Sequence, residues 1–228
     1  TRFWMPSIWL TTSPRNTLTM TTKIEPQFQE FPKMARLSRE CIVTEKIDGT
    51  NAQVYITEDG QFLTGSRNRW ITPENDNFGF SRWAHDHKDE LMTLGVGRHF
   101  GEWWGSGIQR GYGLPKGEKR FSLFNVSRWV LAGQTPGVKS KAWDNAAKAW
   151  KETIQDVLPA CCGLVPVILR GDFDTSSVST AIERLKALGS VAAPGFMDPE
   201  GIVVFHTAGM VGFKKTIKDD ETPKSQIK

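Results

Sequence analysis

Alternating apolar and polar positions predict several β-strands in the first half of the chain. Ala52, Val54 and Ile56 alternate with more polar neighbours, which is the period of a half-buried strand. Residues 58–60 have the composition of a turn, so a strand at 61–64 would complete a hairpin. Short apolar runs predict further strands at residues 41–44, 98–104, 120–126 and 129–131.

Helical spacing of apolar residues predicts three helices. One covers Phe78–Leu94, and another covers Ser177–Leu188 and ends at Gly189. The clearest helical pattern covers Ser140–Leu158 and is followed by Pro159. Its apolar stripe consists of Trp143, Ala146, Ala147, Trp150, Ile154 and Leu158.

The second half of the chain predicts three more strands. Val165–Leu169 is typical of a buried strand, and Gly201–Phe205 and Val211–Thr216 would form a hairpin around Ala208 and Gly209. Strands in antiparallel pairs with helices between them favour an α+β fold over a parallel, doubly wound sheet. The 228 residues, with a mass of 25.6 kDa, fit one such domain.

Composition narrows the class of protein. Lys and Arg number 29 against 25 for Asp and Glu, which gives a net charge of +4 and a pI of about 9.0, compatible with a nucleic-acid partner. No apolar run approaches the roughly 18 residues that indicate a transmembrane helix, so we expect no membrane partner. Cys41, Cys161 and Cys162 fit neither a disulfide framework nor a zinc ribbon, so we expect a reducing, cytoplasmic setting.

The most informative segment is Glu45-Lys46-Ile47-Asp48-Gly49-Thr50-Asn51, which places a lysine at a strand end just before a glycine turn. A single lysine in a turn is usually a solvated charge. Here, however, polar or aromatic residues recur in similar strand-end settings along the chain. These settings are residues 65–67, 100–102, 121–124, 199–204 and 213–215.

Taken in order, these segments resemble motifs I, Ia, III, IIIa, IV and V of the polynucleotide ligase and mRNA-capping superfamily, over about residues 40–216. Asn51, two residues after the glycine of motif I, and the pattern F-G-E-x-x-G at 100–105 are most similar to the RNA ligase 2 family. The resemblance implies an α+β nucleotidyltransferase domain, similar to the ATP-grasp fold. It would have antiparallel sheets, flanking helices and a nucleotide site between the sheets.

The resemblance also assigns roles to residues around the nucleotide. Lys46 would be the nucleophile that attacks the α-phosphate of ATP and forms a lysyl–AMP intermediate. Arg67 would contact a phosphate, and Glu102 would accept a hydrogen bond from the ribose. Phe124 would stack on adenine. Asn51 would engage either a nucleic-acid phosphate or the bound nucleotide.

Further roles fall on residues beside these. Glu45 and the backbone of Ile47 would flank the nucleotide. Glu200 would hold Mg²⁺ or Mn²⁺, directly or through water, since hard cations prefer oxygen ligands. Lys214, with Lys215 as its partner, would neutralise charge that develops on the α-phosphate.

The chain departs from the family pattern in several places. The second cation of motif V usually comes two residues after the first, whereas Lys214 and Lys215 are adjacent. Adjacent strand residues face opposite sides, so only one can point into the site, and we favour Lys214. Asn125 stands where an aspartate is usual, and Phe205 where a lysine is common. Since 13 residues follow Lys215, we expect no C-terminal OB-fold.

The activity that the resemblance implies is that of an ATP-dependent RNA ligase, which joins a 5′-phosphate to a 3′-hydroxyl through lysyl–AMP and an adenylylated 5′ end. The partner would be RNA or a nicked duplex, and the protein a monomer. A minimal DNA nick-sealing ligase would carry the same motifs, and a non-catalytic nucleic-acid-binding protein on this fold is a further alternative. We expect the domain to cover 20–217, between an extension at 1–19 and a charged tail at 218–228, with Met20 as a candidate natural start.

Overall fold

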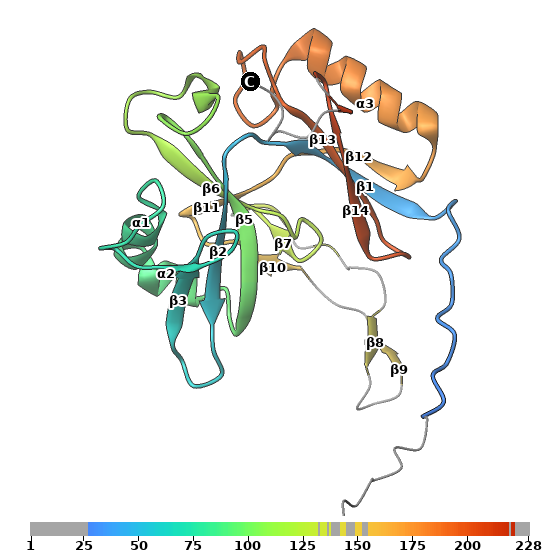
Figure 1. Cartoon of the computed structure of the whole chain (residues 1–228), viewed down its shortest axis with the longest axis horizontal. Helices are drawn as coiled ribbons and strands as arrows, with labels where there is room; N and C mark the ends of the chain where they lie inside the picture. Colours follow the sequence, from blue (N-terminus) through green and yellow to red (C-terminus); the bar gives the residue numbers. More distant parts are fainter. Residues whose placement is uncertain are drawn as a thin grey trace, which may run out of the picture. The chain divides into compact units, whose positions relative to one another are not determined.

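The computed structural model describes residues 27–131, 133–135, 137, 142–144, 149–151, 155–218 and 220–221. The chain divides into two compact units, Thr1–Met34 and Ala35–Lys228. In the first unit, residues 27–34 form neither helix nor strand. Every helix and strand described below belongs to the second unit (Figure 1). The predicted domain limits of 20–217 stay a prediction.

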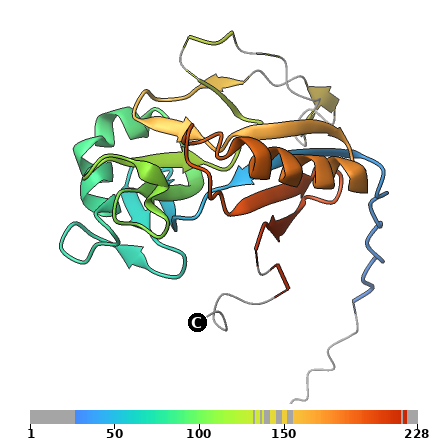
Figure 2. The same cartoon turned by 90° about the horizontal axis from the view of Figure 1, so that it is seen from above.

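A four-stranded antiparallel sheet presents one face to the longest helix. Its order is β12-β1-β13-β14, and the helix is α3 (Thr175–Leu188), which lies along the sheet in Figure 2. Alternation along the strands places Val43 and Ile202 in a core cluster with Leu185 of α3. The strands are β1 (Glu40–Lys46), β12 (Val167–Asp172), β13 (Gly201–His206) and β14 (Val211–Thr216).

A six-stranded sheet carries the largest core, with the order β11-β6-β5-β2-β3-β4. Its core cluster includes Val54, Phe80, Leu91 and Phe121, which come from both the sheet and the helices α1 (Phe80–Asp86) and α2 (Lys88–Met92). All its pairings are antiparallel except that of β11 with β6. The strands are β2 (Thr50–Ile56), β3 (Phe62–Gly65), β4 (Trp70–Ile71), β5 (Gly97–Gly105), β6 (Lys119–Leu123) and β11 (Cys162–Leu164).

A third, smaller core cluster joins Ile47, Trp104, Tyr112, Val165 and Ala193, which come from β5, a 3₁₀ turn and several connections. The two large clusters occupy the helix-covered faces of the two sheets. Since strand residues alternate between faces, every second residue of β1, β13, β2 and β5 is directed to the other face of its sheet. Those faces line the candidate site.

Most of the predicted elements are confirmed. The mixed α+β class and the antiparallel sheets are as expected, β2 and β3 form the predicted hairpin, and β13 and β14 form the other. The helix α3 is capped by Asp174, whose carboxylate accepts the Ser176 N–H, and ends at Gly189, whose positive φ of 78° favours glycine. The helix expected over Phe78–Leu94 is divided into α1 and α2 at His87. Among the described residues, no helix is long and apolar enough to cross a membrane.

The helix predicted over Ser140–Leu158 is wrong wherever the structure describes that segment. The described residues form β8 (Ala142–Asp144), β9 (Ala149–Lys151) and β10 (Asp156–Val157), and β10 pairs with β7 (Trp129–Val130). Trp143 and Trp150 are opposite each other in the β8–β9 ladder. A separation of seven residues places two positions on one helix face, but it equally suits two strands joined by a short connection, and strand pairing prevails here. Residues 140, 141, 145–148 and 152–154 lie outside the described residues.

The buried strand predicted at Val165–Leu169 is also wrong in part. The structure places β11 before this segment and starts β12 at Val167, whose residues are half-buried or exposed. Pro166 separates the two strands, and its carbonyl accepts the Glu45 N–H at 2.9 Å. Proline has no N–H for a strand ladder, which explains the break.

Candidate active site

Lys46 is the last residue of β1, and strand alternation turns its side chain away from α3. Cys41 and Val43 pack on the α3 side, while Ile42, Thr44 and Lys46 line cavities on the opposite side. The side chain of Lys46 is 23% exposed. It is therefore positioned by a buried strand and remains accessible to a substrate.

Glu200 meets the Lys46 ammonium at 2.5 Å and is itself only 2% exposed. The contact follows from strand pairing, because Lys46 lies opposite Gly201 in the β1–β13 ladder. The chain at Gly201 also approaches β14 closely, since a Cβ there would stand 2.1 Å from the Lys215 carbonyl oxygen. A larger residue at this position would displace the strand that carries Lys214.

The edge strand β14 directs its two adjacent lysines differently. Lys214 and Thr216 line the same polar cavity as Lys46. Lys215 is not part of that lining, and its ammonium lies 3.1 Å from Asp220, which lines the cavity. The alternation of the strand therefore places Lys214, the residue that the sequence favoured, on the cavity side of β14, and its role stays a prediction.

Glu102 of β5 accepts hydrogen bonds from two residues, one in the turn that follows Lys46 and one just after it. Its Oε1 accepts the Gly49 N–H at 3.1 Å, and its Oε2 accepts a hydrogen bond from Asn51 at 3.3 Å. A Cβ on Gly49 would stand 2.4 Å from the Trp103 carbonyl oxygen, so this close approach requires glycine. Burial raises the pKa of Glu102 from 4.5 to about 7, against the opposing effects of Lys46 and the Gly49 N–H.

Asp48, the aspartate of the same turn, belongs to a chain of charges that the sequence did not reveal. Its Oδ2 accepts from Arg110 Nε at 3.0 Å, and Arg110 Nη1 donates to Asp198 at 2.7 Å. Lys218 also contacts Asp198, at 2.8 Å, and Lys218 and Arg110 together lower the pKa of Asp198. This chain connects the Lys46 turn to the segment that leads into Glu200.

Arg110 is presented by a turn whose backbone is partly strained. Gln109 and Tyr112 have φ of 44° and 52°, a left-handed conformation that is uncommon outside glycine. The Tyr112 hydroxyl accepts the Asp48 N–H at 2.8 Å, and its ring is buried in the third core cluster. Contacts to Asp48 from both the hydroxyl and the guanidinium stabilise the strained turn. The motif I aspartate was a signal available in the sequence, whereas nothing in the pattern indicated Arg110.

Glu45 and Ile47 flank Lys46 and have mainly structural contacts. The Glu45 carboxylate accepts hydrogen bonds from Ser190 Oγ, Val191 N and Ala192 N at 2.6, 2.7 and 2.9 Å. The Ile47 side chain is 3% exposed in the third core cluster. Both residues line the apolar cavity described next, but the Glu45 carboxylate is already occupied by the 190–192 loop.

Two cavities meet at Lys46, Asn51 and Glu102, which line both. The polar cavity, of about 710 Å³, also contains Arg67. The apolar cavity, of about 720 Å³, opens between the two sheets. Its apolar lining includes Ile42, Leu123, Phe124, Val165, Val203 and Phe205. The arrangement places carboxylates and cations on one side of the Lys46 amine and a mainly apolar chamber on the other.

The predicted metal site rests on Glu200. Within the described residues, no group of three or more His, Cys, Asp or Glu side chains could hold a metal ion by itself. Mg²⁺ commonly binds through one or two carboxylates together with substrate phosphates. Glu200 and Glu102 both line the polar cavity, so the carboxylates present fit an ion that a nucleotide carries in.

Residues 39–218 match the family model described as RNA ligase. The solved structures that resemble the chain include two of Naegleria gruberi RNA ligase mutants, one with AMP and Mn and one with ATP and Mn. Each shares 17% identity and covers 79% of this chain and 50% of the other, with TM-scores of 0.48 and 0.46. The chain thus spans about half the length of these structures. A search of the curated proteins found no match.

Proposed function

The chain belongs to the RNA ligase family, and on this basis we propose that it is an ATP-dependent RNA ligase, most similar to the RNA ligase 2 group, that acts through lysyl–AMP. The observation that carries the proposal is the meeting of Lys46, Glu200, Glu102 and Lys214 in one polar cavity beside an apolar chamber. A nucleotide has the same two parts, a charged phosphate chain and a largely apolar base. The chamber would receive adenine, with Phe124 as the stacking side chain.

In the first step, the Lys46 amine attacks the α-phosphorus of ATP. An N–P bond forms, the bond between the α-phosphorus and the bridging oxygen breaks, and pyrophosphate leaves. The amine must lose a proton to attack, and Glu200 lies at hydrogen-bond distance to accept it. Lys214 stabilises negative charge on the α-phosphate, and Glu102 accepts from a ribose hydroxyl.

In the second step, a 5′-phosphate oxygen of RNA attacks the AMP phosphorus, and the bond to Lys46 breaks. In the third, a 3′-hydroxyl attacks the 5′-phosphate, AMP leaves, and a phosphodiester forms. Arg67 and Asn51, both in the polar cavity, would hold the phosphate of the RNA end. A bound Mg²⁺, held by Glu200, would supply charge neutralisation on the phosphates.

The proposal is tested by incubating the protein with α-labelled ATP and Mg²⁺ and resolving it on a denaturing gel. We expect label on the wild type and none on Lys46→Ala, provided that intact mass shows the purified protein to be free of AMP. An unmodified wild type that takes up no label would contradict the proposal and favour a non-catalytic nucleic-acid-binding protein.

A second assay separates the two enzymatic alternatives. Pre-adenylylated RNA and pre-adenylylated DNA of the same sequence are presented with matching 3′-hydroxyl strands, without ATP. Preferential sealing of RNA supports the proposal, since the 2′-hydroxyl is the group that distinguishes the two. Equal or preferential sealing of DNA would favour a minimal DNA nick-sealing ligase.

A further inference from the structure

On the six-stranded sheet, Tyr55, Trp70 and Arg98 form a partly exposed group that we call the aromatic platform. The two rings are stacked, with centroids 6.1 Å apart and planes inclined by 19°. The Arg98 guanidinium lies 4.1 Å from the Tyr55 ring centre and 5.2 Å from that of Trp70. Trp70 is 48% exposed, so nearly half of a large side chain faces solvent.

The β-sheet holds the platform in place. Tyr55 and Arg98 are direct partners in the β2–β5 ladder, and Trp70 lies opposite Gly65 in the β3–β4 ladder. Gly65 has no side chain, and a Cβ there would stand 2.9 Å from the Gln53 side chain. Gln53 in turn accepts a hydrogen bond from Arg98 at 3.1 Å. The arginine is thus oriented before any ligand arrives.

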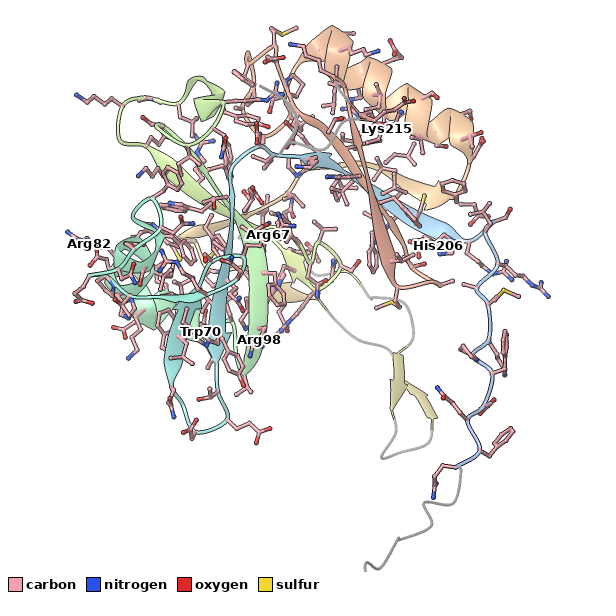
Figure 3. All side chains as sticks on the ribbon, viewed as in Figure 1. Arg67, Trp70, Arg82, Arg98, His206 and Lys215 are labelled. Carbon is pink, nitrogen blue, oxygen red and sulfur yellow. The ribbon has the colours of Figure 1, made fainter. Side chains whose placement is uncertain are left out.

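The platform adjoins the apolar cavity through one of its members, Arg98, and Arg67, three residues before Trp70, lines the polar cavity. Arg67 and Trp70 are also linked through the β3–β4 turn, in which the Ser66 N–H donates to the Arg69 carbonyl at 2.9 Å. Figure 3 labels Arg67, Trp70 and Arg98 over the six-stranded sheet. A chain whose end lies at Lys46 can therefore continue onto the platform.

We propose that the aromatic platform binds the single-stranded RNA segment adjoining the 5′-phosphate end that receives AMP. This inference rests on the proposed function. Cation–π pairs are common in proteins, so the pairing alone indicates no ligand. Here, a half-exposed indole offers a stacking face for a base, while the guanidinium offers N–H groups and positive charge to the RNA backbone. Every base has a π-face, so the contact should tolerate any sequence.

The test measures binding of a fluorescent, 5′-phosphorylated ten-nucleotide RNA to the full chain by anisotropy, without ATP. We expect Trp70→Leu to weaken binding at least about fivefold, the lower end of what one base–aromatic stack contributes. Trp70→Tyr should restore most of the affinity. Arg98→Gln should reduce the slope of log Kd against log salt by about 0.7, the value for one phosphate contact with a single strand.

Two controls separate this proposal from the proposed function and from a loss of fold. Arg82→Gln changes another exposed arginine, which Figure 3 shows apart from the platform on α1, and should leave binding unchanged. Self-adenylylation with ATP, which needs no RNA, reports the integrity of the Lys46 site in each variant. An adenylylation-competent Trp70→Leu protein that binds RNA like the wild type would overturn the platform. Wild type that binds RNA through the platform but takes up no AMP would instead contradict the ligase.

Discussion

The Lys46 ammonium and the Glu200 carboxylate lie 2.5 Å apart although 154 positions separate them in the chain. The pairing of β1 with β13 creates this contact, because Lys46 faces Gly201 and Glu200 directly precedes it. A buried carboxylate therefore contacts the nucleophile that we propose, where it can orient the amine and accept its proton.

Replacing Glu200 with Gln should reduce self-adenylylation by about 10²- to 10⁴-fold, the range for loss of a general base. The amide keeps the size of the side chain but offers no negative charge to the amine. Label transfer from α-labelled ATP measures the rate. Glu183→Gln serves as the control, because it removes an exposed carboxylate from an ion pair with Lys186 on α3. Equal rates in the two variants would show that the Glu200 contact has no catalytic role.

Lys214→Ala and Lys215→Ala should differ sharply although the residues are neighbours. Lys214 lines the polar cavity, so its loss should slow adenylylation by about 10²- to 10³-fold, as when one charge-stabilising donor is removed. Lys215 pairs with Asp220 at the surface, and exposed ion pairs contribute little, so its loss should change the rate less than about fivefold. Single-turnover adenylylation compares the variants. The reverse order of effects would mean that β14 presents its other face to the nucleotide.

Glu102→Gln should unfold at higher urea concentration than the wild type at pH 8 but not at pH 5. The folded pKa of Glu102 is about 7, above its ordinary 4.5, so the folded state binds more protons between these values. Stability is therefore lost as pH rises through that window, by at most about 3–4 kcal/mol at about 1.4 kcal/mol per pKa unit. The amide avoids this penalty and still offers an oxygen to the Gly49 N–H, while the Asn51 amide must turn its oxygen toward the new N–H₂ group. A stability difference independent of pH would contradict the raised pKa.

The same Glu102→Gln substitution should lower activity while it stabilises the fold. A neutral amide is a weaker acceptor for a ribose hydroxyl than a carboxylate. Adenylylation rates measured against ATP concentration would show whether nucleotide binding is weakened. Such an opposition between stability and activity is typical of charged groups buried at functional sites.

Arg110→Met should destabilise the protein by about 1–3 kcal/mol, because it removes a hydrogen-bonded cation from the mostly buried carboxylate of Asp48. Arg110 is itself 26% exposed, which places the effect below that of a fully buried pair. Urea unfolding measures the change, and a double-mutant cycle with Asp48→Asn isolates the pair. Lys218→Ala tests the outer end of the same charge chain and should cost less than 1 kcal/mol, since that lysine is 64% exposed. Additive effects of the Asp48 and Arg110 substitutions would show that they do not interact.

Apolar spacing predicted a helix over Ser177–Leu188 and another over Ser140–Leu158, and the structure confirms only the first of these two. The helix predicted over Ser177–Leu188 is confirmed with its end at Gly189, although it begins two residues earlier, at Thr175, after the Asp174 cap; both end signals are local in the sequence. Ser140–Leu158 was predicted wrongly because apolar spacing alone does not reveal a partner strand, and Trp143 and Trp150 are register partners in the β8–β9 ladder. Local signals were sufficient for the first segment, whereas pairing between segments determined the second.

The sequence by itself determined much of the strand and turn pattern, because strand alternation and turn chemistry act over a few residues and are visible along the chain. The resemblance of its motifs to the polynucleotide ligases singled out Lys46, Glu102, Glu200 and the motif V lysines, although Glu102 lies inside β5 rather than at a strand end. The tertiary structure decided which of these residues lie together. The Lys46–Glu200 contact depends on the pairing of β1 with β13. Because α3 covers one face of the sheet, the cavity that Lys214 lines lies on the opposite face. The tertiary structure alone brought Arg110 to Asp48, across 62 positions, because a charge pair of that separation leaves no periodic trace in a sequence.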